Sequence, residues 1–193
     1  MNDILKEDID FNNVEINNKT FKDKYEYKSF SNVKFLDCKF NNVGFSTSNF
    51  NQAIFEHCEF LNCFFVDLNF SMVSIINSKL SYCNFEKIKG KKIKINNCLL
   101  INPEFKEINI KDNDFKFNKF NSANFDKSKI NDTTFDYTEL DNLNISDSVF
   151  NNCQFNASKI IDYKGKLESF KGSYLSLNQI LDMVSNMGIN LKD

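Results

Sequence analysis

Residues 30–70 read FSNVKFLDCKFNNVGFSTSNFNQAIFEHCEFLNCFFVDLNF, and every fifth residue of this stretch is phenylalanine. The spacing continues without a slip to Ile160, since every fifth residue from Phe30 onward is Phe, Ile or Leu, except Gly90. A period of five matches neither an α-helix nor a β-strand and indicates a repeat architecture. Each such residue is called a frame position here, and the residue two before it occupies the minus-two slot.

The cysteines all occupy one kind of position. The minus-two slot holds Cys38, Cys58, Cys63, Cys83, Cys98 and Cys153. Elsewhere the slot is filled mostly by Ala, Ser, Thr, Val, Ile or Leu, as at Ala53 and Thr133. A slot that accepts Cys, Ala and Val alike is a small buried site, where cysteine behaves as a small hydrophobic residue. With one histidine and no Cys-x-x-Cys pair, a metal or redox site is the less favoured interpretation.

Composition excludes several function classes. A net charge of −2 and a pI near 5.6 argue against direct nucleic-acid binding through bulk positive charge. No apolar run is long enough to span a membrane, and residues 1–8 lack a secretory signal pattern, so we expect a cytoplasmic protein. A Ser-His or Cys-His arrangement would have to use His57, and no glycine-rich phosphate loop is present. We therefore predict a non-enzyme with no catalytic, cofactor-binding or metal-binding residues.

The repeat divides the chain into three segments. Residues 1–8 form a polar N-terminal end, residues 9–175 the repeat region, and residues 176–193 a C-terminal helix and tail. Phe11, Ile16 and Phe21 repeat at five, but Phe30 follows Phe21 by nine residues, which predicts an irregular corner at about 22–29 with Tyr25 as a substitute inward residue. Gly90 leaves one inward site empty, so residues 88–94 are the expected weak point.

The last segment changes period. Ser176 and Gln179 form a capping-box pattern, and the apolar residues that follow recur at three and four. This pattern predicts a short amphipathic helix that covers the last coil as a lid, supplies a homodimer contact, or does both. The candidate dimer contact consists of Leu177, Ile180, Leu181, Met183, Val184 and Met187.

The repeat resembles the pentapeptide-repeat family. Ala123-Asn124-Phe125-Asp126-Lys127 and Cys83-Asn84-Phe85-Glu86-Lys87 follow its pattern of a small residue, a polar residue, Leu or Phe, and two polar or turn residues. The resemblance implies an all-β solenoid, a right-handed quadrilateral β-helix with four pentads per coil and about 7–8 coils, followed by the C-terminal α-helix.

The C-terminal segment is similar to the quinolone-resistance (Qnr) branch of that family and its mycobacterial counterpart. The resemblance implies a homodimer through the C-terminal helix and a mimic of double-stranded DNA that binds type II topoisomerases, namely DNA gyrase or topoisomerase IV. Qnr proteins of Gram-negative type carry two loops that interrupt the repeat. The frame from Phe30 to Ile160 has room for neither loop, so the loopless mycobacterial type is the nearer pattern.

A DNA mimic needs an ordered negative surface, and residues twenty apart stack on one face of such a coil. One face carries the acidic column, which consists of Asp67, Glu86, Glu104, Glu107, Asp126 and Asp147. Lys87, Lys106 and Lys127 lie on the same face, and a neighbouring face holds a basic cluster of Lys89, Lys91, Lys92 and Lys94. Two interpretations stay open: a topoisomerase footprint, or a mixed-charge surface on a scaffold with an unknown protein partner.

Overall fold

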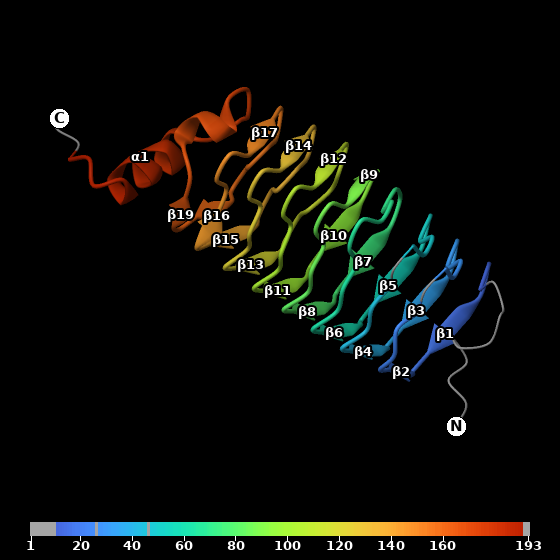
Figure 1. The fold of residues 1–193 in the computed structure, drawn as a ribbon. Helices are drawn as coiled ribbons and strands as arrows, with labels where there is room; N and C mark the ends of the chain where they lie inside the picture. Colours follow the sequence, from blue (N-terminus) through green and yellow to red (C-terminus); the bar gives the residue numbers. More distant parts are fainter. Residues whose placement is uncertain (1–10, 26, 46, 191–193) are drawn as a thin grey trace.

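The chain forms a parallel β-solenoid of about seven turns with one short C-terminal helix (Figure 1). This computed structural model describes residues 11–25, 27–45 and 47–190. The expected polar end at residues 1–8 lies outside the described residues. Successive coils stack along the axis as a rod, with the N-terminal coil at one end and α1 (Leu177–Asn186) at the other. No helix among the described residues is long and apolar enough to cross a membrane.

The strands are two or three residues long and stack in parallel register into four sheets. The five-stranded face runs in the order β1 (Glu15–Asn17), β3 (Lys34–Leu36), β5 (Ile54–Glu56), β7 (Ser74–Ile76), β10 (Lys94–Asn96). The eight-stranded face contains β2 (Thr20–Phe21), β4 (Lys39–Asn41), β6 (Glu59–Leu61), β8 (Lys79–Ser81), β11 (Leu99–Ile101), β13 (Lys119–Asn121), β15 (Glu139–Asp141), β18 (Lys159–Ile160).

The other two faces are shorter. The four-stranded face contains β9 (Lys89–Lys91), β12 (Asn109–Lys111), β14 (Lys129–Asn131), β17 (Val149–Asn151). The turn-rich face is held mainly by isolated bridges, such as Phe64 to Asn84 and Glu104 to Asn124, and ends in the pair β16 (Leu143–Asn144) and β19 (Tyr163–Lys164). A short 3₁₀ helix, η2 (Leu167–Phe170), follows β19.

The corners of the coil have one repeated backbone conformation. Every fifth residue from Asn32 to Ala157, two positions after each frame residue, is left-handed with φ between 48° and 62°. Apart from glycine, asparagine and aspartate adopt this conformation most readily, which explains why they are frequent there. A left-handed residue at each fifth position turns the chain and returns the next frame residue to the axis. The five-residue period of the sequence therefore reflects one turn of the chain at each corner.

The core is a column of stacked aromatic rings. The rings of Phe35 and Phe55 lie 4.9 Å apart at 3°, and those of Phe40 and Phe60 lie 4.7 Å apart at 7°. Rings on neighbouring faces meet edge to face, as Phe45 and Phe50 do at 90°. Both arrangements are favourable for aromatic pairs. Frame phenylalanines from position 30 to position 70 are at most 2% exposed.

Most minus-two slots hold small buried side chains, as predicted, and their polar members also form a hydrogen-bond ladder. The Ser128 hydroxyl donates to the Phe105 carbonyl 23 residues earlier at 2.7 Å, and the Cys63 thiol donates to the Phe40 carbonyl at 3.2 Å. The Cys58 amide donates to the Ser78 hydroxyl one coil later. All six cysteines are buried and free, so the prediction that they fill inward sites is confirmed.

The coil around Gly90 is filled in a different way. Its minus-two slots hold the large residues Ile88, Ile93 and Ile108, which are 2–4% exposed. Only a cavity of about 20 Å³ remains in the interior beside them. Strand β9 also lies close to the preceding coil, because a Cβ atom at Gly90 would stand 3.0 Å from the Ser71 nitrogen. The empty frame site is therefore compensated by bulky neighbours and close backbone packing.

The irregular N-terminal corner is a single four-residue step. Phe21 pairs with Phe40, 19 residues later, whereas Lys24 pairs with Gly44, 20 residues later. The missing residue therefore falls between Phe21 and Tyr25. Tyr25 is 1% exposed and its ring lies 5.8 Å from that of Phe45, which confirms it as an inward residue.

The C-terminal helix closes the last coil through polar contacts. Ser176 accepts a hydrogen bond from the Gln179 amide, and the Gln179 side chain accepts one from the Ser176 amide, so the capping box is present. The Gln179 side-chain amide also donates to the carbonyls of Phe155 and Ser158, both at 2.7 Å. Met183 is fully buried beneath the helix. Through these contacts the helix covers the last coil as a lid. Its opposite side leaves apolar residues such as Leu177 exposed.

Candidate partner-binding faces

The acidic column lies on the turn-rich face, spread over five successive coils. Asp67, Glu107 and Asp147 occupy left-handed corner positions, with φ of 55°, 56° and 53°. Glu86 and Asp126 directly follow the buried frame residues of their coils, and Glu104 directly precedes one. Figure 1 shows the coils stacked one above another, so residues twenty apart lie in rows along the rod.

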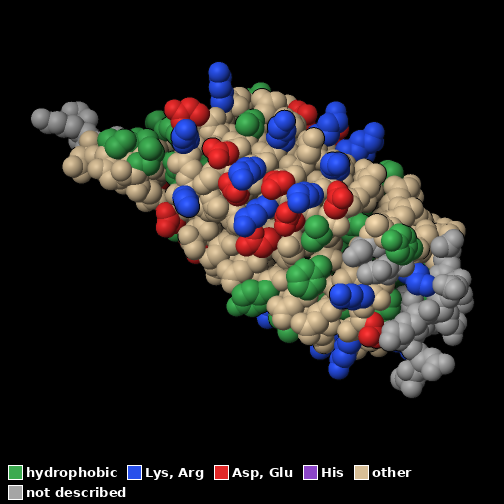
Figure 2. Space-filling view, in the orientation of Figure 1, with side chains coloured by type: hydrophobic (Ala, Val, Ile, Leu, Met, Phe, Trp, Pro, Cys, Tyr) green, Lys and Arg blue, Asp and Glu red, His purple; other side chains and the backbone are tan. Residues whose placement is uncertain are grey.

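Lysines alternate with these acids along the rows. The corner row reads Asp67, Lys87, Glu107, Lys127 and Asp147 in successive coils, so each lysine stands between two acids. A second row reads Glu86, Lys106 and Asp126. Figure 2 shows acidic and basic side chains intermixed in the same way on the face in view. The structure therefore gathers the six acids on one face and places cations among them.

Ion pairs reinforce this alternation. The Lys87 ammonium lies 3.1 Å from the Glu86 carboxylate, and the Lys106 ammonium lies 3.6 Å from the Glu104 carboxylate. Hydrogen bonding and charge from Glu86, and then the charge of Glu107, raise the pKa of Lys87. The Asn124 amide donates to Glu104 at 2.8 Å and accepts from the Asn144 amide at 3.0 Å, which extends the polar row by two coils.

The C-terminal helix presents an apolar surface beside its lid contacts. Leu177 is 73% exposed, Leu181 38% and Met187 52%. Ile180 and Val184 are half-buried. Met183 faces the last coil and is not accessible to a partner. Five of the six candidate dimer residues thus remain available on the outside.

Metal-binding groups are not gathered in the part of the chain that the structure describes. Those residues contain no group of three or more His, Cys, Asp or Glu arranged to hold a metal ion. The His57 imidazole is about half exposed and lies 3.9 Å from the Asp37 carboxylate, at a corner of the rod. Burial raises the pKa of the Cys98 and Cys153 thiols to about 11, which keeps them protonated. A hydrogen bond with the Cys58 thiol lowers the pKa of Cys38 to about 7 while Cys38 stays buried.

An exposed aromatic pair was not among the predicted site residues. The rings of Phe117 and Tyr137 stack 5.1 Å apart at 5° and are 54% and 58% exposed. Both residues are left-handed, with φ of 58° and 57°, a conformation that costs a bulky residue about 1–2 kcal/mol. The signal was present in the sequence, because both are aromatic, off the frame and twenty residues apart.

Comparisons with known proteins identify the fold. The sequence matches no protein-family profile and no curated protein. Among solved structures, it is similar to one trypsin-treated variant of QnrB1, with a TM-score of 0.60 and 17% identity over 94% of this chain and 92% of that chain. It is also similar to a second trypsin-treated QnrB1 variant, with a TM-score of 0.63 and 16% identity over 95% of this chain and 93% of that chain.

This protein has the pentapeptide-repeat fold. QnrB1 is described as a plasmid-mediated fluoroquinolone resistance protein. A third solved structure, the pentapeptide repeat protein HetL of the cyanobacterium Nostoc, is involved in regulating heterocyst differentiation. It matches with a TM-score of 0.46 and 11% identity over 86% of each chain.

Proposed function

We propose that the protein is a non-enzymatic homodimeric rod that binds a type II topoisomerase, such as DNA gyrase, as a mimic of double-stranded DNA. The observation that carries the proposal is the acidic column, in which five successive coils each bring an acid to one face. Its six acids outnumber Lys87, Lys106 and Lys127 and leave the face negative. The fold likeness to QnrB1, a fluoroquinolone resistance protein, supports a role in quinolone resistance or topoisomerase regulation.

The dimer in this proposal forms through the outer surface of α1. Leu177, Leu181 and Met187 expose apolar area next to the half-buried Ile180 and Val184. Exposed apolar residues grouped at one end of a polar rod favour association. A two-fold contact there would join two rods end to end and double the length of the negative face. The cytoplasm is the proposed location, where thiols stay reduced, in keeping with six free cysteines.

Gyrase supercoiling, measured with and without ciprofloxacin, tests the topoisomerase proposal. We expect micromolar protein to inhibit supercoiling or to relieve inhibition by the drug. The variant Glu86→Gln/Glu107→Gln/Asp126→Asn should weaken the effect about tenfold, since complementary charge guides such association. A control variant with the same charge change, Glu59→Gln/Asp132→Asn/Glu139→Gln, removes acids from other faces and should stay within about twofold of the native protein. No effect of the native protein in either condition would reject the proposal.

Sedimentation equilibrium tests the dimer separately. The native protein is expected to sediment as a dimer, and Leu181→Lys should shift it to a monomer while the unfolding temperature changes little, because Leu181 is partly exposed. Leu61→Lys is the matched control, because it places the same charge at an exposed leucine of the distant strand β6 and should leave the dimer intact. If the native protein is a monomer at high concentration, the dimer proposal is wrong and α1 serves only as a lid.

A second candidate function is a scaffold that docks a different protein partner. The Phe117–Tyr137 pair favours it, because stacked aromatic rings that are more than half exposed resemble frequent binding hot spots. Capture from a host lysate should then recover a partner that Phe117→Asn/Tyr137→Asn no longer binds. Recovery of topoisomerase subunits and nothing else would count against this candidate.

A further inference from the structure

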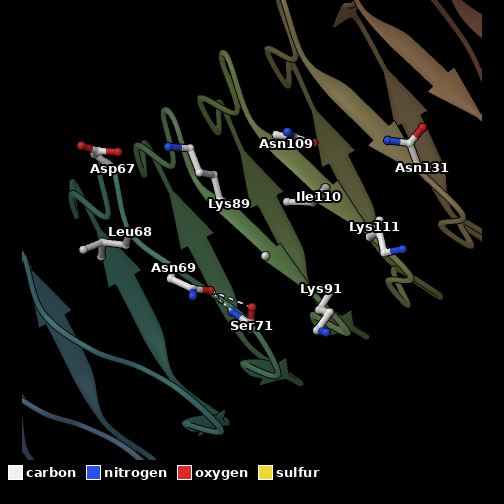
Figure 3. A pocket seen from close by; sticks show the side chains of 11 residues that line it. Asp67, Leu68, Asn69, Ser71, Lys89, Lys91, Asn109, Ile110, Lys111 and Asn131 are labelled. Atoms are coloured by element: carbon white, nitrogen blue, oxygen red, sulfur yellow. Dashed lines mark hydrogen bonds between the residues drawn. The ribbon is translucent and has the colours of Figure 1, made fainter.

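The four-stranded face has a hollow over Gly90 (Figure 3). Its volume is about 550 Å³ and it opens to solvent. The hollow follows from the sequence, because β9 has no inward side chain to hold it away from the coil before it. A Cβ atom at Gly90 would stand 3.1 Å from the Phe70 carbonyl carbon. The β9 backbone therefore lies close to the preceding coil, and the longer side chains around Gly90 form the rim of the hollow.

The charged side chains that line the hollow are mainly cationic. Lys89, Lys91 and Lys111 surround it, and Asp67 is the one acidic residue of its lining. Lys91 and Lys111 are direct neighbours in the parallel register of β9 and β12, where strands lie about 4.8 Å apart. Lys89 precedes Lys91 by two residues on the same side of the strand, about 6.6 Å along it. The three ammonium groups thus rise from a compact triangle of backbone positions.

Few of these charges are neutralised by the protein. Lys111 lies 3.7 Å from the Asp112 carboxylate, and Lys87 rather than Lys89 pairs with Glu86. Among the described residues, no ion pair is formed by Lys89 or Lys91. Like charges placed side by side on a sheet are destabilising. An unbalanced cation cluster on a protein of net charge −2 is a local conflict of the kind found at binding sites.

The remaining lining adds hydrogen-bond donors. Asn109 and Asn131 contribute side-chain amides from β12 and β14. At the opposite edge, the Asn69 carboxamide accepts from the Ser71 amide at 3.0 Å and the Ser71 hydroxyl at 2.7 Å, which fixes that rim (Figure 3). Ammonium groups and amides together are donors suited to an oxygen-rich anion.

Phosphate fits this donor set better than carboxylate. The chain contains no arginine, which binds carboxylate and phosphate alike through two parallel hydrogen bonds, so the cations of this site are lysines. Lysine acts as a point charge and is a regular phosphate ligand. A triangle with sides of about 5, 7 and 8 Å exceeds the reach of one phosphate, whereas a short phosphate chain extends across it. A rigid nucleic-acid duplex would lie across the rim and leave the floor at Gly90 empty.

We propose that the hollow over Gly90 binds a small anion that carries two or more linked phosphate groups, held by Lys89, Lys91 and Lys111. The phosphate chain lies along the floor of β9, and the amides of Asn109 and Asn131 donate to its oxygens. This site is on the face next to the acidic column, and it does not depend on the proposed topoisomerase function. It gives the rod a place where a soluble metabolite can bind without covering the acidic face.

Isothermal titration calorimetry of the full-length protein with sodium tripolyphosphate tests the site. We expect saturable binding with one site per chain, weaker at about 150 mM than at about 25 mM NaCl because salt screens the lysines. Lys89→Gln/Lys91→Gln/Lys111→Gln should weaken binding at least tenfold, about 1.4 kcal/mol or more. Inorganic phosphate should bind at least tenfold more weakly than tripolyphosphate.

A matched control separates the site from general charge. Lys79→Gln/Lys119→Gln/Lys159→Gln removes the same charge from the eight-stranded face, on the far side of the rod (Figure 1), and should bind within about twofold of the native protein. Unfolding temperatures of both variants check that each is folded. ATP added as a second titrant distinguishes a nucleotide from an inorganic phosphate chain, and either source agrees with the proposal. Absence of tripolyphosphate binding, equal loss in both variants, or tighter binding of a short DNA duplex would each overturn it.

Discussion

Two regions of the rod fill the same shaft with different residues. From Phe30 to Phe70 the frame supplies large rings, and the minus-two slots hold small residues such as Ala53 and Cys58. At Gly90 the frame supplies no side chain, and the nearby slots at Ile88, Ile93 and Ile108 hold isoleucines instead. The comparison teaches that each coil needs a fixed volume of buried side chains. Frame positions and minus-two slots can both supply that volume. Three sets of substitutions test this exchange of volume and a fourth tests the corners, in order of expected effect.

The largest effect should come from removing a ring in the phenylalanine region. Phe55→Ala is expected to lower the free energy of unfolding by about 4 kcal/mol, because Phe55 is fully buried and stacks on Phe35. Urea denaturation measures the loss. Phe117→Ala is the matched control, and as a half-exposed residue it should change stability by less than about 0.5 kcal/mol. Equal losses for the two variants would contradict the shaft as the source of stability.

In the Gly90 region, the slot residue should contribute as much to the free energy of unfolding as a frame residue does elsewhere. Ile88→Ala is expected to cost about 3 kcal/mol, since it enlarges a cavity that already measures about 20 Å³. The corresponding change in the other region, Cys58→Ala, should cost about 1 kcal/mol because a ring fills the space beside it. Denaturation midpoints of the two variants give the comparison. Similar losses of stability in Ile88→Ala and Cys58→Ala would show that the slots are equivalent. The idea that frame positions and slots share one volume would then be wrong.

Overfilling a slot in the phenylalanine region should also destabilise the rod. Ala53→Ile is expected to lose about 2 kcal/mol, as the rings leave no room for a larger side chain. Adding Phe55→Leu to this variant should cost less than the two single losses combined, because it returns volume. Thermal unfolding of the three variants measures the coupling. Strict additivity would mean that the two positions do not share one space.

The smallest effect concerns the corners, which are alike in both regions. Met72→Asn should raise the unfolding temperature by about 2–4 °C, because asparagine tolerates the left-handed φ of 61° better than methionine. The reverse change, Asn97→Met, should lower it by a similar amount at a corner with φ of 56°. Calorimetry of both variants decides. A drop for Met72→Asn would show that the methionine side chain makes a contact worth more than the backbone strain.

The sequence predicted the solenoid, the buried cysteines, Tyr25 as an inward residue and the capping helix, because each depends on spacing along the chain. It did not predict that Asn113 and Asn118 would be buried in minus-two slots, 4% and 3% exposed. Asparagine is usually an exposed residue, and its burial depends on amide partners in the preceding coil, such as Ile93 and Cys98. Those partners are twenty residues away and follow from the register of the stack.

The candidate sites were harder to predict, because they depend on contacts between coils and on side-chain conformations. The acidic column was found from the period, yet the ion pairs that bind Lys87 to Glu86 and Lys106 to Glu104 depend on rotamers. The basic cluster was visible as charge, but the hollow among its side chains depends on how Gly90 packs against the preceding coil. The helix surface was predicted as a single stripe, and the structure divides it between the buried Met183 and an exposed remainder.

The two amide contacts of Gln179 bear on how long such a molecule can grow. A parallel stack ends in a strand edge that is a template for another copy, and unprotected edges of this kind lead to filaments. Gln179 occupies the carbonyls of Phe155 and Ser158, and the Asn186 amide occupies that of Ile161. With these carbonyls occupied, the last coil offers no free strand edge at Phe155, Ser158 and Ile161, and the helix blocks β-sheet polymerisation from this end of the rod.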